Sequence, residues 1–210
     1  MLDFLSLTIV IPTLIGLLRF KSIDKSYQLF VCLLTTSSLS TINYSFNPSI
    51  YAKHLGSHLL GVVESLLMLL RLCRWDINRI NHTLKCLFII SLIILQGIGI
   101  FLIKDNRFAT NWPQILVLAV LVGYAFSLLT QTKFIALPNT NLVTRKLILI
   151  PYLIINVYYI SIKIMLHFLY SPANEPIFID LYSILVIFNF LSYICYSISL
   201  LWAPKKEKYL

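Results

Sequence analysis

Residues 179–202 read IDLYSILVIFNFLSYICYSISLLW and contain a single charged residue, Asp180. The hydrocarbon core of a bilayer is about 30 Å thick, so an α-helix needs about 20 mostly apolar residues to cross it. This stretch is long enough, and its polar groups are mainly hydroxyls and one amide, which helices tolerate inside a membrane bundle. It therefore predicts a membrane-spanning helix.

Similar apolar stretches recur along the rest of the chain. We predict spans at residues 2–20, 27–47, 55–75, 84–103, 114–132, 147–169 and 179–202. The chain of 210 residues is 59% hydrophobic and 12% charged, whereas a soluble domain has about 25% charged residues. We therefore expect an all-α fold, in which residues 1–210 form a single transmembrane domain of seven helices.

The lysines and arginines are divided unevenly between the two sides of such a bundle. One side receives only Lys53, Lys104 and Arg107, while Lys163 falls inside a span. The other side receives Arg19, Lys21, Lys25, Arg71, Arg74, Arg79, Lys85, Lys133, Arg145, Lys146, Lys205, Lys206 and Lys208. Because cytoplasmic loops attract Lys and Arg, we predict an outer N-terminus, a cytoplasmic C-terminus and a multi-pass location in the bacterial inner membrane.

The net charge of +9 would suggest nucleic-acid binding in a soluble protein. Here the basic residues lie in short loops between apolar runs, with no basic face or aromatic platform outside the spans. We therefore predict no nucleic-acid partner. The expected partners are the lipid bilayer and another membrane or signalling protein.

Two formal charges lie well inside predicted spans, Glu64 in the third and Lys163 in the sixth. At 1.5 Å per residue they lie about 13 and about 9 Å below the outer surface. An unpaired buried ion costs several kcal/mol, so one interpretation is a structural ion pair that fixes the helix order. Alternatively, Lys163 extends to the outer interface and Glu64 is protonated in a dry site, or both belong to a ligand or ion site.

More polar side chains gather at a similar depth on five different spans, including Asn43 on the second span. For each amide, an interhelical hydrogen bond is the alternative to a ligand contact, and for each histidine, a buried position at a helix interface. Together they predict a cavity open to the outside. The candidate ligand or ion-pair residues are Glu64, Lys163, His58, His167, Asn156, Gln96 and Asn189.

Motifs of enzymes and metalloproteins are missing from the sequence. It contains no paired-histidine zinc motif, no serine nucleophile elbow and no P-loop. We therefore predict no catalytic residue, no metal ligand and no cofactor, and the sequence favours a protein other than an enzyme.

The stretch PTLIGLLRFKS at residues 12–22 has a proline at its start and a basic end. In both features it resembles the first motif of PQ-loop transporters, with Thr13 in place of the glutamine. The pair Pro113-Gln114 occurs at the outer end of the fifth span without the basic residues that follow in that family. The resemblance implies seven helices, an outside-to-inside orientation and the transport of a small solute.

A second resemblance rests on the end of the first span and on the third span. Ile11-Pro12 and Gly16 precede the basic sequence Arg19-Phe20-Lys21, and His58 and Glu64 lie on the third span. In these features the chain is similar to small, uncharacterised seven-span membrane proteins of Bacteroidetes. That resemblance implies the fold and leaves the activity open.

These observations lead to three functional hypotheses. The first is a receptor-like or sensory module that binds a ligand from outside, near Glu64 and Lys163, and signals through a partner. The second is a small-solute transporter, whose site would lie near the middle of the membrane. The third is a structural subunit of a membrane complex.

Overall fold

The computed structural model describes residues 7–46, 50–75, 90–91, 94–95, 111–131, 139–169 and 175–204. Within these ranges the chain is helical and forms no β-strand. The helices are α2 (Val10–Arg19), α3 (Lys25–Phe46), α4 (Ile50–Trp75), α6 (Asn111–Thr130), α8 (Asn139–Leu169) and α9 (Glu175–Trp202). The predicted all-α fold is therefore confirmed for the described part of the chain.

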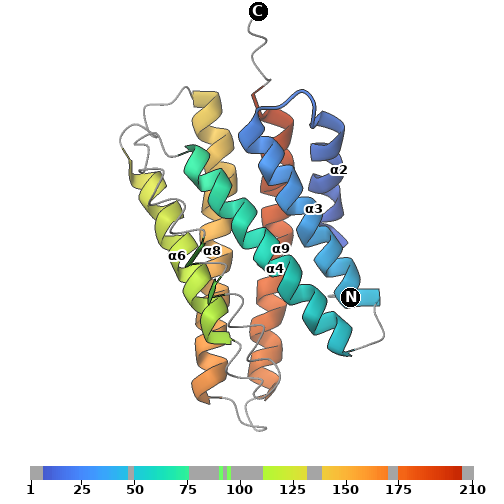
Figure 1. The fold of residues 1–210 in the computed structure, drawn as a ribbon, viewed down its shortest axis with the longest axis vertical. Helices are drawn as coiled ribbons and strands as arrows, with labels where there is room; N and C mark the ends of the chain where they lie inside the picture. Colours follow the sequence, from blue (N-terminus) through green and yellow to red (C-terminus); the bar gives the residue numbers. More distant parts are fainter. Residues whose placement is uncertain are drawn as a thin grey trace, which may run out of the picture.

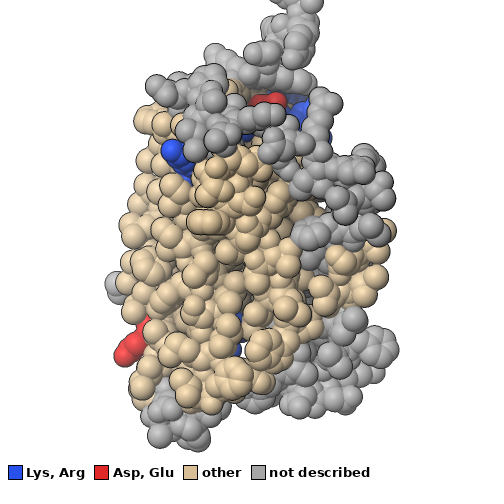
Figure 2. Space-filling model, turned by 90° about the vertical axis from the view of Figure 1, so that its left-hand side faces the viewer, with Lys and Arg blue, Asp and Glu red and all other residues tan. Residues whose placement is uncertain are grey.

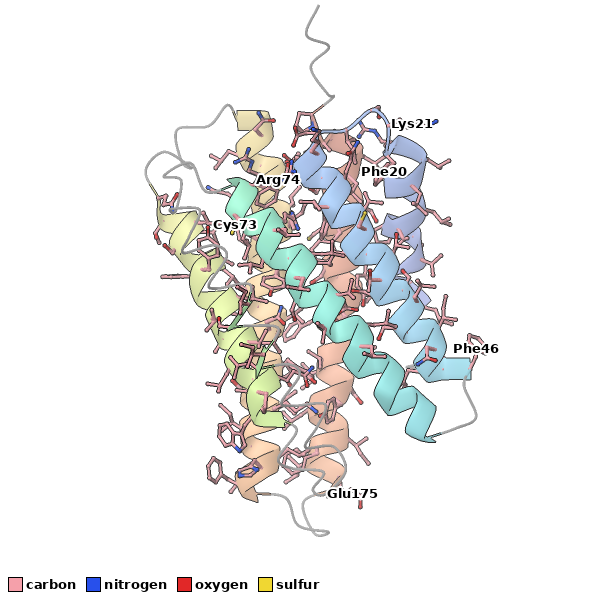
Figure 3. The ribbon with its side chains drawn as sticks, in the orientation of Figure 1. Phe20, Lys21, Phe46, Cys73, Arg74 and Glu175 are labelled. Atoms are coloured by element: carbon pink, nitrogen blue, oxygen red, sulfur yellow. The ribbon has the colours of Figure 1, made fainter. Side chains whose placement is uncertain are left out.

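Figure 1 shows a bundle in which α2, α8 and α9 stand close to the long axis, while α3 and α4 are tilted across it. Helices α2, α4, α6 and α9 end where α3 and α8 begin. We call this the cationic end, because it carries Arg19, Arg71, Arg74 and Arg145. Figure 3 places Arg74 and Lys21 toward it and Phe46 and Glu175 toward the opposite end.

Four of the described helices are long and apolar enough to cross a membrane. They cover Lys25–Phe46, Trp112–Thr130, Asn141–Leu169 and Glu175–Trp202. Helix α2 is shorter, with 10 residues, and α4 carries more polar side chains along its 26 residues. The chain therefore has the character of a membrane protein, while spans 2–20, 55–75 and 84–103 stay predictions.

The outer surface of the bundle is apolar over most of its height. Leu18, Phe126 and Phe168 expose 88%, 61% and 68% of their surface. Figure 2 shows one face on which a broad tan area separates charged residues near the two ends. Large exposed apolar surfaces mark contact with lipid or protein, and an apolar band between charged ends suits a bilayer.

Several helices begin earlier than the sequence predicts. Helix α4 begins at Ile50, α8 at Asn139 and α9 at Glu175, whereas the predicted spans begin at 55, 147 and 179. In α8 the difference arises because Arg145 and Lys146 were assigned to a loop, although a helix continues beyond the membrane at little cost. Of the predicted span 84–103, only residues 90–91 and 94–95 are described, and they are helical.

Near the cationic end, α2, α3 and α9 approach closely at Gly16. A Cβ added there would lie 2.5 Å from Val31 Cγ2 and 3.3 Å from Leu200 Cδ1. Only glycine leaves room for this contact, as small residues do at many helix interfaces in membranes. One turn away, the Thr13 and Ser38 hydroxyls share a hydrogen bond of 2.8 Å between α2 and α3.

The last turn of α9 is held by side chains and backbone from the α2–α3 region. The Arg19 guanidinium donates from Nη1 to the carbonyls of Leu200 and Leu201 and from Nη2 to that of Ala203 at 3.3 Å. These carbonyls have no partner inside the helix, and a cation also suits the negative end of the helix dipole. The backbone N–H of Asp24 donates to the Pro204 carbonyl at 3.4 Å.

Candidate binding cavity

A cavity of about 330 Å³ lies in the middle of the bundle, where residues of α3, α4, α6, α8 and α9 and Ile9, directly before α2, line it. Its depth follows from the helical rise of about 1.5 Å per residue. Glu64 lies about 16 Å before the end of α4, and Tyr193 lies about 14 Å before the end of α9. Its walls alternate apolar residues with hydroxyl, amide and carboxyl groups. The polar residues that line it are Ser37, Ser40, Thr41, Glu64, Ser65, Tyr152, Asn156, Asn189, Tyr193 and Tyr196.

Glu64 supplies the only carboxyl group among the described lining residues. The Ser37 hydroxyl on α3 donates a hydrogen bond to it, and the backbone carbonyl of Ser37 in turn accepts from Thr41 Oγ1 at 3.0 Å. One hydroxyl leaves most of the acceptor capacity of a carboxylate unused. The carboxyl group can therefore bind a cation or a hydrogen-bond donor inside the cavity.

Asn156 on α8 and Asn189 on α9 line the same cavity as Glu64. Asn156 Nδ2 donates to the Tyr152 carbonyl at 2.7 Å, which leaves its amide oxygen as an acceptor. Ser65 Oγ donates back to the Gly61 carbonyl at 2.8 Å, as hydroxyls in helices often do. Of the residues that the sequence analysis singled out, Glu64, Asn156 and Asn189 thus lie in the lining of one cavity, and their role in binding stays a prediction.

Three tyrosines that the sequence did not single out form much of the remaining wall. Tyr152 on α8 and Tyr193 on α9 line the cavity together with Glu64. Tyr196 extends the wall toward the cationic end and packs edge to face on Phe30, with ring centroids 5.0 Å apart. A pocket with aromatic walls and a few convergent polar groups is typical of small-ligand sites.

The other predicted site residues do not join the described lining of the cavity. The Lys163 ammonium lies 5.3 Å from the Tyr159 ring centroid, and among the described residues Glu64 bonds to Ser37 instead of to Lys163. His167 packs on Trp112, with centroids 5.2 Å apart, at the end opposite the cationic end. The His58 side chain and Gln96 lie outside the described residues.

Between the cavity and the cationic end lies a group of side chains that we call the aromatic layer: Tyr27, Phe30, Trp75 and Tyr196, packed around Arg71. The Arg71 side chain is 0% exposed, and its Cζ lies 4.0 Å from the ring centroids of both Phe30 and Trp75. The Tyr27 and Trp75 rings lie 5.9 Å apart. This layer closes the bundle between the cavity and the cationic end.

Sequence reasoning missed Arg71, because its position near a predicted span end placed it with the loop cations. The signal available was its spacing of four residues from Trp75, which puts the two side chains on one helix face. For the tyrosines, Asn189, Tyr193 and Tyr196 follow the helical period on α9. That pattern marks one polar and aromatic face directed into the bundle.

Asp24 lies in the loop before α3. Among the described residues outside the predicted spans, it is the one acid whose pKa departs clearly from its ordinary value. Burial alone raises the pKa of Asp24, but hydrogen bonds from the Ser26 hydroxyl and from backbone N–H groups, together with the charge of Arg74, outweigh it and lower the pKa below 3.8. Ser26 Oγ donates to Asp24 Oδ1 at 2.6 Å and the Ser26 N–H at 2.8 Å. Asp24 thus acts as the N-cap of α3.

Among the described residues, no group of three or more His, Cys, Asp or Glu side chains has positions suited to a metal ion. Comparison of this chain with protein-family models, curated proteins and solved structures finds no match. The functional assignment therefore depends on the cavity and on the residues around it.

Proposed function

We propose that this chain is a seven-span protein of the bacterial inner membrane and works as a receptor-like module. In this proposal it binds a small polar solute in the cavity around Glu64. A partner protein relays the signal. The observation that carries the proposal is a mid-bundle cavity of about 330 Å³ with one carboxyl group, two amides and three tyrosines in its wall.

The seven-span topology is supported by the directions of α4 and α6. Tyr124 on α6 contacts Cys73 on α4 through a hydrogen bond of 3.9 Å, near the end of each helix. Since both helices end at the cationic end, residues 76–110 link opposite ends of the bundle, and they include the apolar stretch 84–103. One crossing in that segment makes seven.

The orientation is supported by the charges at the cationic end. Arg19, Arg71, Arg74 and Arg145 lie there, whereas Glu175 and Asp180 lie near the opposite end of the bundle. Cytoplasmic faces are enriched in Lys and Arg, so the cationic end faces the cytoplasm. The aromatic layer then closes the cavity on the cytoplasmic side, which leaves the outer side as the route of entry.

A solute-binding screen tests the proposed function. Purified protein in detergent is heated with a panel of small amines, polyols and amino acids, and we expect at least one compound to raise the unfolding temperature. Glu64→Gln should weaken that response about tenfold or more, because it removes the only charge on the described cavity wall. Glu175→Gln, at an exposed glutamate on α9, is the matched control and should respond like the wild type.

Two results would contradict the receptor assignment. One is a panel without any stabilising compound, and the other is a response that Glu64→Gln leaves intact. The topology has its own test, in which reporter fusions at the two chain ends should report opposite compartments. Both ends in one compartment would exclude an odd number of spans.

A transporter is the second candidate, and Pro151 is the observation that favours it. Pro151 lies inside α8, directly before the cavity residue Tyr152, and its missing N–H leaves the Leu147 carbonyl without its helical partner. A proline of this kind allows a helix to bend beside a mid-membrane site. Uptake of a stabilising compound into proteoliposomes would identify transport, and binding without uptake would favour the receptor.

A structural subunit is the third hypothesis, and a bond between Glu64 and Lys163 would favour it. The described contacts of Glu64 and Lys163 are with Ser37 and Tyr159 instead. An unchanged unfolding temperature in Glu64→Gln would argue further against a structural role for this carboxyl group.

A further inference from the structure

Arg71 has no hydrogen-bond acceptor among the described residues, although it is completely buried. Its Nε, Nη1 and Nη2 atoms are all without a hydrogen bond. No carboxylate is among the groups that act most strongly on it, which are Tyr27, Tyr196, Arg145 and Tyr152. A guanidinium has five N–H donors, and a buried charge without acceptors is costly, so packing alone gives no reason for an arginine here.

The surroundings of Arg71 leave one part of its side chain available. The Phe30 and Trp75 rings flank the guanidinium carbon, each with its centroid at 4.0 Å, and such cation–π contacts partly offset the loss of water. The two rings carry no acceptor atom, so they cannot accept ordinary hydrogen bonds from the N–H groups that point outward in the guanidinium plane. These N–H groups form the edge of the guanidinium, which can donate two parallel hydrogen bonds to a carboxylate or phosphate. Arg145, 5.3 Å from the Trp75 ring, adds a second positive charge nearby.

Arg71 lies one layer of side chains away from the cavity. Met68 lines the cavity one turn before Arg71 on α4, and the lining residue Tyr196 packs on Phe30, whose ring lies against the Arg71 guanidinium. Glu64 and Arg71 are separated by a helical rise of about 10 Å on α4. Because Arg71 is 0% exposed, a solute in the cavity can reach the guanidinium only when a side chain of the wall between them, such as Tyr196, moves aside.

We propose that Arg71 binds the acid group of the cavity solute, so that the ligand is a zwitterion with its amino group at Glu64 and its carboxylate or phosphate at Arg71. This inference rests on the proposed function of the cavity as a binding site. The spacing of the two charges favours a solute whose amino and acid groups stand at opposite ends of a short apolar chain. The tyrosine and methionine side chains between them suit such a chain.

Three probes of equal chain length test the proposal: 5-aminopentanoate, pentylamine and pentanoate. Their affinities for purified wild-type protein are measured by isothermal titration calorimetry at one ionic strength. We expect 5-aminopentanoate to bind at least tenfold more tightly than pentylamine or pentanoate, because only the zwitterion reaches both charges.

Variants of Arg71 separate its contribution from that of Glu64. Arg71→Met should reduce the affinity for 5-aminopentanoate to that for pentylamine, while pentylamine binding stays unchanged. Arg71→Lys keeps the positive charge but cannot form the bidentate pair of hydrogen bonds, so it should give an intermediate affinity. Arg74→Met, at an exposed arginine three residues later, should bind all three probes like the wild type.

The unfolding temperature without ligand provides a second readout. Replacing a buried ion without hydrogen-bond acceptors by an apolar side chain of similar volume is often neutral or stabilising, so Arg71→Met should unfold at or above the wild-type temperature. A large decrease in the unfolding temperature would show that Arg71 stabilises the fold and would overturn the proposal.

The binding outcomes distinguish two kinds of failure. If pentylamine and 5-aminopentanoate bind equally in the wild type and in Arg71→Met, the role of Arg71 is excluded, while the cavity keeps its function. If none of the three probes binds, a zwitterionic ligand of this kind is excluded. The proposed function is then tested separately by the broader solute panel.

Discussion

The cavity and the aromatic layer each bury one charged side chain, and they do so in different ways. Glu64 borders open space and accepts a hydrogen bond from Ser37, whereas Arg71 is completely buried between the Phe30 and Trp75 rings. The cavity is lined by short polar groups, while the layer is packed with the largest side chains of the core. The same bundle therefore contains an open polar region around Glu64 and a tightly packed region around Arg71.

Because of this difference, we expect substitutions in the tightly packed part of the bundle to lower the free energy of unfolding. Substitutions at positions with open space around them should change it little. The sharpest comparison uses two glycines. Gly16→Ala should lower the free energy of unfolding by about 1–3 kcal/mol, because its Cβ would meet Val31 Cγ2 at 2.5 Å and force the helices apart. Thermal unfolding in detergent measures the effect, and Val31→Ala in the same chain should restore part of it.

The matched control for that change is Gly61→Ala on α4. No heavy atom lies within 4 Å of a Cβ added at Gly61, and alanine is the better helix former by about 1 kcal/mol. We expect stability equal to or above that of the wild type. If Gly16→Ala and Gly61→Ala lowered the free energy of unfolding equally, the proposed difference in packing between the two regions would be wrong.

A second comparison uses two cations at opposite ends of the bundle. Arg19→Met removes the hydrogen bonds to Leu200, Leu201 and Ala203, and hydrogen bonds to charged groups contribute about 1.5–3 kcal/mol. Lys163→Met removes one cation–π contact with Tyr159, for which about 0.5–1 kcal/mol is typical. Denaturant titration of both variants should therefore show the larger loss in Arg19→Met, and the reverse order would contradict the assigned roles.

The smallest expected effect concerns pH. Because the pKa of Asp24 is lower in the folded protein than its ordinary value of 3.8, its contribution to stability is present above the unfolded pKa and is lost as the pH falls through the folded pKa. The wild type should lose stability between about pH 5 and pH 3, while Asp24→Asn should show a flatter profile. Ser26→Ala, which removes one donor to the carboxylate, should fall between them; identical profiles would exclude the cap.

The sequence predicted the helical class well, because apolar length and helical periodicity are local properties. It predicted helix ends less well: α8 begins at Asn139, although Arg145 and Lys146 resemble loop residues. Charge alone does not end a helix, since long basic side chains reach water from a helical backbone.

For the candidate site, the sequence placed Glu64, Asn156 and Asn189 in one region, and all three line the cavity. It paired Glu64 with Lys163 from depth alone, whereas contact also requires that both side chains face each other. Rotation about the helix axis is set by packing, for which one sequence gives only indirect signals. Arg71 and Tyr196 were missed for the same reason, since their roles come from neighbours on α3 and α8.

The contacts of Arg19 and Asp24 with the end of α9 have a consequence for biogenesis. A ribosome delivers the first hairpin to the membrane long before residues 200–204 leave the exit tunnel. Until then the Gly16 face contacts Val31 on α3 but lacks its contact with Leu200 on α9. Nascent chains arrested before α9 should therefore keep the first hairpin open to chaperones or proteases, and full-length release should close it in a single late step.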